Sequence, residues 1–301
     1  MKELYKDAVA NEIVLEAFDE ESSIFKDLSG FQRRIMTEAS IVAITLHIYA
    51  LDSLFRADEL CDTNGSGAVK SWDTAVAALV GWTEGSEDGG SSDNGVLFYN
   101  IAQYLCKKAG KCNMADDSEV NRSLISRLQE GKQQLLSKDC VGAYTQAMEI
   151  EKLLQTVLVD TVAFFAKQIV DDKLDTESVV EGYIFAEALT PIFDTLDQAA
   201  SSVIRQNLGS FPNDNLMKDG MTAVYVALRS FVNRQAIDCA LLTTPICQYT
   251  ANTNTAPVIA DNNGFLPGTG TNEDISPPDN QNDANSLLGG AYTPTSNVDA
   301  M

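Results

Sequence analysis

Apolar residues recur at helical spacing along most of the chain. Ile41, Ile44, Ile48, Leu51 and Phe55 follow one another at alternating steps of three and four residues. This spacing places the five side chains on one face of a helix, where they can be buried together. The pattern therefore predicts an amphipathic helix over residues 41–55.

A second apolar pattern is longer and more regular. Ala143, Ile150, Val157 and Phe164 recur every seven residues, which is typical of a long helix in a bundle. Similar spacing predicts helices over 3–18 and 221–242. It also predicts a helix pair over 179–208, or one helix bent at Pro191, because proline removes a backbone hydrogen bond.

Polar segments separate these helices, and the alternation typical of strands is almost absent. Breaks rich in Gly, Ser and Asp fall at 62–70, 84–95, 110–118 and 209–220. We therefore expect an all-α fold: a disulfide-tied helical bundle over residues 1–248 with long polar loops. Residues 249–301 contain no Lys or Arg and are rich in Asn, Thr, Pro and Gly, which predicts an extended acidic arm. Such an arm is a free tail or stalk, or docks on a cell surface or a second copy.

The charge and composition argue against nucleic-acid-binding and membrane-spanning proteins and favour a folded globular chain. With 43 acidic and 21 basic residues, the net charge is −22, which argues against nucleic acid as a partner. At 45% hydrophobic residues the chain can bury a sizeable core. The most apolar run, over residues 41–51, is shorter than a membrane span, so we expect none.

Six cysteines indicate a disulfide framework. Two close pairs, Cys106 with Cys112 and Cys239 with Cys247, favour local loops, and elimination leaves Cys61 with Cys140. Other pairings stay open at this stage, as does a cytosolic protein with six buried thiols. Disulfides and the sequons at Asn64 and Asn121 favour an extracellular or periplasmic glycoprotein, although the chain begins without an apolar signal core.

One segment resembles a calcium loop of the EF-hand type. Counting from Asp62, side-chain oxygens stand at positions 1, 3 and 5 of the twelve-residue loop, and Gly67 stands at position 6, where the chain must turn sharply. Position 12 is Asp73, where the longer Glu is usual. A lysine, Lys70, also falls at a ligand position. The alternative is an ordinary Asx/Gly-rich turn. The candidate calcium ligands are Asp62, Asn64, Ser66, Ala68 and Asp73.

Other candidate ligands are acids in helical, apolar surroundings. Glu84, Glu181 and Glu187 are candidate iron ligands, because carboxylates that project into a helical bundle can hold iron. The alternative is that they cap helices or face solvent. His47, the only histidine, is a weaker candidate, since its helical neighbours are apolar and a core position is its ordinary interpretation. One histidine and no nucleophile or phosphate motif argue against an enzyme.

Two blocks of sequence resemble the algal iron-assimilation proteins, also described as high-carbon-dioxide-inducible periplasmic proteins. The first block carries Trp72-Asp73-x-Ala75, Gly81, Glu84-Gly85, Gly95 to Tyr99, Ala102, Cys106 and Cys112. The second block is Glu181-Gly182-Tyr-Ile-Phe185-Ala186-Glu-Ala188-Leu-x-Pro191, and Cys239 and Cys247 fit the disulfide-bearing end. The likeness extends to imelysin-like iron-regulated bundles, although their GxHxxE pattern is missing after His47.

This resemblance implies a secreted or periplasmic, non-enzymatic protein that helps the cell to assimilate iron. Oxygen ligands suit ferric iron and calcium alike, and the acidic charge would concentrate cations. The competing hypothesis is an extracellular structural or self-assembling protein, stiffened by disulfides and calcium, whose arm docks on a neighbour.

Overall fold

The computed structural model describes Leu15 and residues 28–81, 97–114, 117–171, 176–209 and 216–249. All regular structure in these residues is helical, which confirms the predicted all-α class. Of the predicted helix 3–18 only Leu15 is described, and the arm beyond residue 249 lies outside the described residues. In chain order the helices are α2 (Gly30–Ser40), η1 (Ile41–Leu46), α3 (His47–Cys61), α4 (Gly65–Leu79), α5 (Phe98–Ala109), α6 (Glu119–Ser137), α7 (Cys140–Asp171), α8 (Thr176–Leu196), α9 (Gln198–Leu208), α10 (Gly220–Arg234), η2 (Cys239–Leu241) and η3 (Ile246–Gln248).

The first described helix is nearly continuous from α2 to α3. Ser29 caps its start: the Ser29 hydroxyl accepts the Gln32 N–H at 3.2 Å, and the Gln32 side chain accepts the Ser29 N–H at 2.8 Å. The π-helical turn η1 joins α2 to α3, and its residues Val42, Ala43 and Ile44 are buried. The predicted apolar face of residues 41–55 therefore spans two helical forms, and Ile41, which the pattern placed on that face, is 41% exposed.

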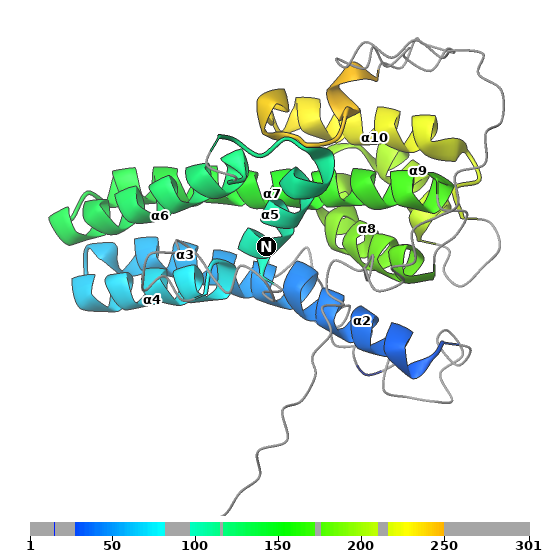
Figure 1. The fold of residues 1–301 in the computed structure, drawn as a ribbon. Helices are drawn as coiled ribbons and strands as arrows, with labels where there is room; N and C mark the ends of the chain where they lie inside the picture. The colour runs from blue at the N-terminus through cyan, green and yellow to red at the C-terminus, as the bar shows by residue number, and fades with distance from the viewer. Residues whose placement is uncertain are drawn as a thin grey trace, which may run out of the picture.

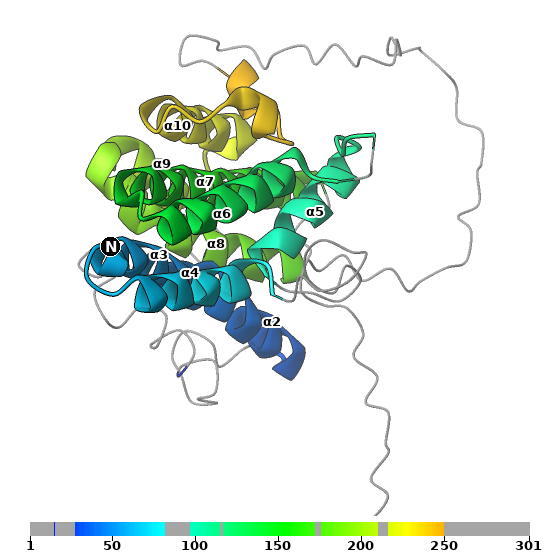
Figure 2. The same ribbon diagram turned by 90° about the vertical axis from the view of Figure 1, so that its left-hand side faces the viewer.

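Two helix pairs, α3 with α4 and α6 with α7, pack on each other and form one half of the molecule (Figures 1 and 2). Trp72 of α4 joins the pairs, because its indole N–H donates to the Leu128 carbonyl of α6 at 2.9 Å. A Cβ on Gly131 would lie 2.1 Å from the Trp72 ring, so only glycine lets the two helices approach this closely.

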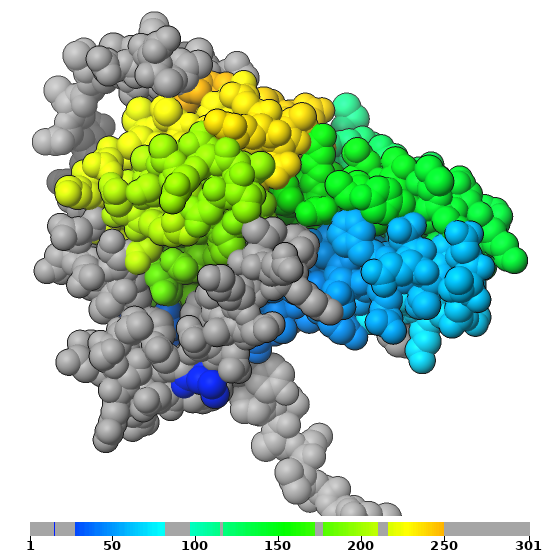
Figure 3. Space-filling model, turned by 180° about the vertical axis from the view of Figure 1, so that it is seen from behind, coloured from blue at the N-terminus to red at the C-terminus, as the bar shows by residue number. Residues whose placement is uncertain are grey.

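Helices α8, α9 and α10 form the other half (Figure 3); α8 and α10 pack against α7, and α8 also packs against α2. Residues 179–208 form the predicted helix pair, but the break falls at Asp197 and α8 continues through Pro191. The Asp197 carboxylate caps α9 by accepting the Ala200 N–H at 3.1 Å, and it also accepts the Ser230 hydroxyl at 2.6 Å. This capping residue ends one helix and begins the next.

The segment after α10 corrects two predicted boundaries. The helix predicted over 221–242 ends at Arg234, because the chain turns at Ala236 with φ of 49°. Tyr249, the first residue of the predicted arm, is buried, and its ring lies 4.7 Å from the Tyr225 ring. The folded part of the chain therefore includes residue 249.

The six cysteines pair as predicted. Cys61 is bonded to Cys140, which joins the end of α3 to the start of α7. Cys106 pairs with Cys112, and Cys239 with Cys247. The three bonds establish the disulfide-tied bundle.

Two helical stretches, Gly30–Cys61 and Cys140–Asp171, are long and apolar enough to cross a membrane. In the fold 56% and 78% of their apolar windows are buried, and the core helix of a water-soluble protein passes the same test. The expected lack of a membrane span therefore stays a prediction.

Candidate functional site

His47 lies in the core at the junction of η1 and α3. Its side chain is fully buried, and its ring is 5.4 Å from the ring of Phe98. Burial lowers the pKa of His47 to about 4, and a hydrogen bond with the backbone of Ala43 offsets part of this effect. The imidazole is therefore neutral at physiological pH and packs as a core side chain.

The predicted carboxylate ligands have different surroundings. Glu181 is fully buried in α8. Burial raises the pKa of the Tyr104 phenol to about 12, and the nearby Glu181 charge adds to this rise. Glu187 is half-buried on the same helix; burial raises its pKa, and the Arg205 guanidinium offsets part of the rise. Glu84 lies outside the described residues.

These candidates do not form a metal centre in the part of the chain that the structure describes. No group of three or more His, Cys, Asp or Glu side chains there is arranged to hold a metal ion. Iron binding through Glu181, Glu187, His47 and the undescribed Glu84 stays a prediction.

The predicted calcium segment folds as the start of a helix. Residues 65–73 belong to α4, and Asn64 is its N-cap, with the side-chain oxygen accepting the Gly67 N–H at 3.1 Å. The same oxygen accepts the Ser66 hydroxyl at 3.2 Å. Calcium binding stays a prediction, and in the structure Asn64 and Ser66 take part in the cap of α4.

The remaining calcium candidates lie apart from this cap. Asp73 pairs with Lys132 of α6 at 2.8 Å, Ala68 is buried inside α4, and Asp62 is exposed at the turn before it. The break predicted over 62–70 is correspondingly shorter, because the helix begins at Gly65.

The two sequons also differ in exposure. Asn64 is exposed, whereas Asn121 is buried, and its amide donates to the Tyr99 carbonyl at 2.8 Å. A glycan needs an exposed amide nitrogen, so the folded chain cannot carry one at Asn121.

A cleft that the sequence did not indicate lies between α7 and the two short disulfide loops. It has a volume of about 310 Å³, at the low end of the usual range for ligand pockets. The Cys106–Cys112 loop, the Cys239–Cys247 loop and the last two turns of α7 supply its walls: Lys108, Ala109, Phe164, Lys167, Gln168, Asp171, Thr243, Thr244 and Pro245.

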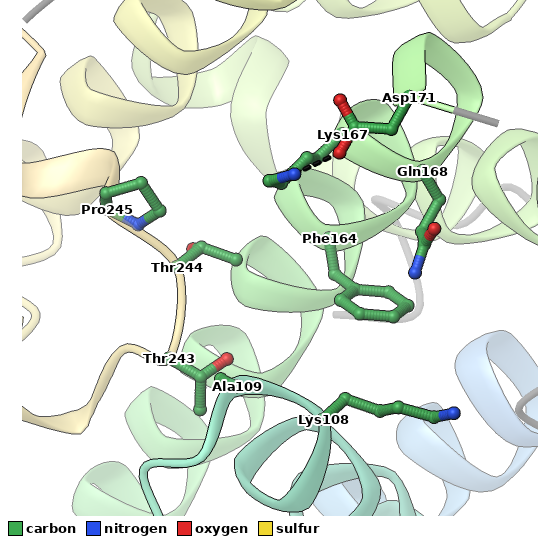
Figure 4. A pocket seen from close by; sticks show the side chains of 9 residues that line it. All are labelled: Lys108, Ala109, Phe164, Lys167, Gln168, Asp171, Thr243, Thr244 and Pro245. Carbon is green, nitrogen blue, oxygen red and sulfur yellow. Dashed lines mark hydrogen bonds and ion pairs between the residues drawn. The ribbon is translucent and has the colours of Figure 1, made fainter. Parts of the chain in front are cut away.

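The lining combines an aromatic ring with charged groups. Figure 4 shows the Phe164 ring in the middle, with Lys108 below it and Gln168 and Asp171 above. Lys167 pairs with Asp171 one turn further along α7. The ring of Phe164 also meets the Tyr104 ring edge-on at 5.9 Å between centroids. One side of the cleft therefore has a fixed apolar surface with charges at its margin.

The Thr243–Thr244 wall is held in place by a buried carboxylate. The N–H and hydroxyl of Thr243 donate to Asp160 Oδ2 at 2.8 and 2.6 Å. The Thr244 N–H donates to Asp160 Oδ1 at 2.9 Å, and its hydroxyl donates to the same oxygen. Burial raises the pKa of Asp160, and these four hydrogen bonds offset part of that rise. Asp160 is 3% exposed, so this anchor ties the loop to the centre of α7.

The second disulfide loop has a further contact at its sulfur atoms. Arg229 of α10 directs its guanidinium at Cys239, with 2.9 Å between Nη1 and Sγ. This contact holds one end of the loop and the Asp160 anchor holds its middle, so the wall of the cleft is pre-formed. Pre-organised walls are typical of small-molecule sites.

The positive charge of the Cys106–Cys112 loop is visible in the sequence. Lys107, Lys108 and Lys111 lie between Cys106 and Cys112 with no acidic residue among them. In a chain of net charge −22 such a cluster is exceptional. Nothing in the sequence indicated that α7 and residues 243–245, far away along the chain, would complete the cleft.

No family of proteins, no curated protein and no solved structure matches the chain. The resemblance to the algal iron-assimilation proteins therefore stays an expectation, and function must be argued from the residues of this chain.

Proposed function

We propose that this protein works outside the cytoplasm as a non-enzymatic binding protein, with the cleft between the two disulfide loops as its ligand site. The observation that supports this proposal is the convergence of both short disulfide loops on one cavity. Disulfides form and persist in oxidising compartments, and all three bonds here would keep a binding surface rigid there.

The content of the cleft supports binding rather than catalysis. Its titratable groups are two lysines and one aspartate, and Lys167 and Asp171 already pair with each other. The two threonine hydroxyls donate to Asp160, but that carboxylate already accepts four hydrogen bonds and is a weak base toward an alcohol, and the lining contains no histidine that could take its place. The groups that remain can orient a ligand.

Fragment binding to the oxidised full chain tests the site. Amide chemical shifts are followed by NMR while organic acids, amides and amines of fewer than about ten heavy atoms are added. We expect shifts at Ala109, Gln168 and Thr244. Ala109→Trp should abolish them by filling the cleft, whereas Ala240→Trp, at an exposed position outside the lining, should leave them intact. Fragments that move no amide around the cleft would overturn the proposal.

The compartment is tested separately. Protein recovered from its native cells is alkylated before and after reduction, and the modified cysteines are counted by mass spectrometry. We expect no thiol to react before reduction. Reduced cysteines in cytosolic fractions would contradict the proposed location.

Iron assimilation, which the resemblance implies, is a second proposal. The observation in its favour is that the Glu181 carboxylate is near enough to the Tyr104 phenol to affect its pKa, since carboxylate and phenol oxygens are both hard ligands. Against it, the Lys108 ammonium lies 5.4 Å from the centre of the Tyr104 ring and would repel a cation.

Metal content after loading with ferric iron and calcium, followed by desalting, tests this second proposal. Iron retained by the protein and lost in Glu181→Gln, but not in the half-buried control Glu151→Gln, would support it. Calcium lost in Asp62→Ala would support the calcium interpretation of the segment before α4. Protein that retains no iron would overturn tight iron binding.

A further inference from the structure

Resting on the proposed function, we propose that the cleft binds a small organic anion, a carboxylate whose apolar body packs on Phe164 and whose charge is held by Lys108. The chemistry of the lining, taken wall by wall, supports this ligand class over neutral and cationic ones.

The net charge of the residues that line the cleft is opposite in sign to that of the whole protein, and the Asp160 carboxylate lies behind the threonine wall. The chain carries 43 acidic and 21 basic residues, yet the lining has two lysines and one aspartate. Lys107 and Lys111 add positive charge within the same disulfide loop as Lys108. A protein this acidic repels small anions in general, so a local positive site is needed to hold one.

Lys108 is the cation that is available to a ligand. Its ammonium lies over the Tyr104 ring, and among the described residues no carboxylate is within ion-pair distance of it. Lys167, by contrast, already pairs with Asp171 across one exposed helical turn. Exposed pairs of this kind contribute little to stability, so Lys167 can turn to a bound anion as a second partner.

The opposite wall selects a different part of the ligand. The hydroxyl hydrogens and the N–H groups of Thr243 and Thr244 all donate to Asp160, so these four donors are not available to an anion and the threonine oxygens can only accept. Lone pairs attract ligand donors and repel anions. The carboxylate therefore belongs on the Lys108 side, and a hydroxyl or N–H of the ligand belongs near Thr243.

The Phe164 ring at the floor of the cleft and the volume of the cleft limit the shape and size of the uncharged part of the ligand. Phe164 presents an aromatic ring whose position is fixed by Tyr104 at 5.9 Å and by Phe165 at 5.3 Å. A planar or apolar body can stack or pack there. The volume of about 310 Å³ admits a small metabolite and excludes a folded peptide.

Three aromatic probes of similar size and different charge test the proposal: benzoate, benzamide and benzylamine. Each is titrated into the oxidised full chain, and the shifts of the Ala109, Gln168 and Thr244 amides give the dissociation constant. We expect benzoate to bind at least tenfold more tightly than benzamide, and benzylamine to be weakest. Lys108→Gln should weaken benzoate roughly tenfold and leave benzamide unchanged, because it removes only the charged contact.

A matched control separates a local contact from the overall charge. Lys132→Gln removes the same charge from α6, where Lys132 pairs with Asp73 outside the cleft, and should change benzoate binding less than twofold. Raised salt should weaken benzoate but not benzamide.

The outcomes distinguish the two proposals. Equal binding of the three probes at the cleft, or an equal effect of Lys132→Gln and Lys108→Gln, would overturn the anion inference while the binding function stands. If none of the three probes moves a cleft amide, and neither does the wider fragment panel, both proposals fail.

Discussion

Asp160 and Thr243 are hydrogen-bonded twice across 83 positions of sequence, through the Thr243 N–H at 2.8 Å and its hydroxyl at 2.6 Å. The carboxylate belongs to the middle of α7, and the threonine to the loop that η2 begins. This contact fixes one wall of the cleft to the core helix, so the site depends on a residue that does not face the cleft.

Loss of the Asp160 carboxylate should therefore damage both stability and the cleft. Asp160→Ala leaves the buried donors of Thr243 and Thr244 without an acceptor, and we expect the free energy of unfolding to fall by about 3–5 kcal/mol. Denaturant unfolding measures the loss, and amide exchange at residues 243 and 244 should rise. Asp171→Asn, an exposed acid on the same helix, is the control and should cost less than about 1 kcal/mol. Equal effects of the two changes would contradict this role of Asp160.

His47 should make the protein less stable in mild acid. Its pKa in the fold is about 4 and the ordinary value is 6.5, so between these values the unfolded chain takes up a proton that the folded chain does not. Stability is thus fully present above pH 6.5 and is lost as the pH falls towards 4, by about 3 kcal/mol in total.

Carboxylates titrate in the same range, so the measurement compares wild type with His47→Leu by denaturant unfolding at several pH values. The difference in unfolding free energy should be constant above pH 6.5 and shift in favour of the variant below it. A difference that does not vary with pH would show that burial of His47 carries no such penalty.

Gly131 should not tolerate a side chain. Its Cβ would lie 2.1 Å from the Trp72 ring, so Gly131→Ala must separate α4 from α6 and stretch the hydrogen bond from the indole to Leu128. We expect a loss of about 1–3 kcal/mol and a change in Trp72 fluorescence. Gly30→Ala, where nothing lies within 4 Å of the new atom, should be close to neutral. Comparable losses in the two variants would refute the close-packing explanation.

The long-range disulfide should stabilise the chain more than a short one. Cys61 and Cys140 are 79 positions apart, and Cys106 and Cys112 only 6. Restriction of the unfolded chain predicts losses of about 4.5 and about 2 kcal/mol when each pair is replaced by alanines. Denaturant unfolding of the two double variants gives the comparison. A larger loss from the short loop would mean that native-state contacts, and not chain entropy, dominate.

Local patterns were sufficient for the class of fold. Steps of three and four from Ile41 to Phe55, and the seven-residue repeat from Ala143 to Phe164, each predict a helix with one buried face, and both helices are present. The cysteine pairing also followed from spacing, because two pairs lie close together in the chain. Boundaries were less accurate: a helix start at Gly65 and a break at Asp197 depend on single side-chain caps.

The candidate metal ligands show why residue types alone are insufficient. Asp73 has an appropriate side chain for calcium, but packing of α4 on α6 places it beside Lys132. Glu187 likewise has an appropriate side chain for iron, but the packing of α9 places the Arg205 guanidinium near its carboxylate. Partners supplied by other helices decide what a carboxylate does, and such partners are not visible in a local pattern.

The sequence by itself determined the helical periodicity, the acidic charge and the basic disulfide loop of Lys107, Lys108 and Lys111, because each is a local property of the chain. The tertiary structure alone decided that this loop, the end of α7 and residues 243–245 enclose one cleft. The physical reason is that the cleft depends on a buried carboxylate, Asp160, meeting backbone donors more than 80 positions away. Contacts at that separation are selected by the packing of the whole core.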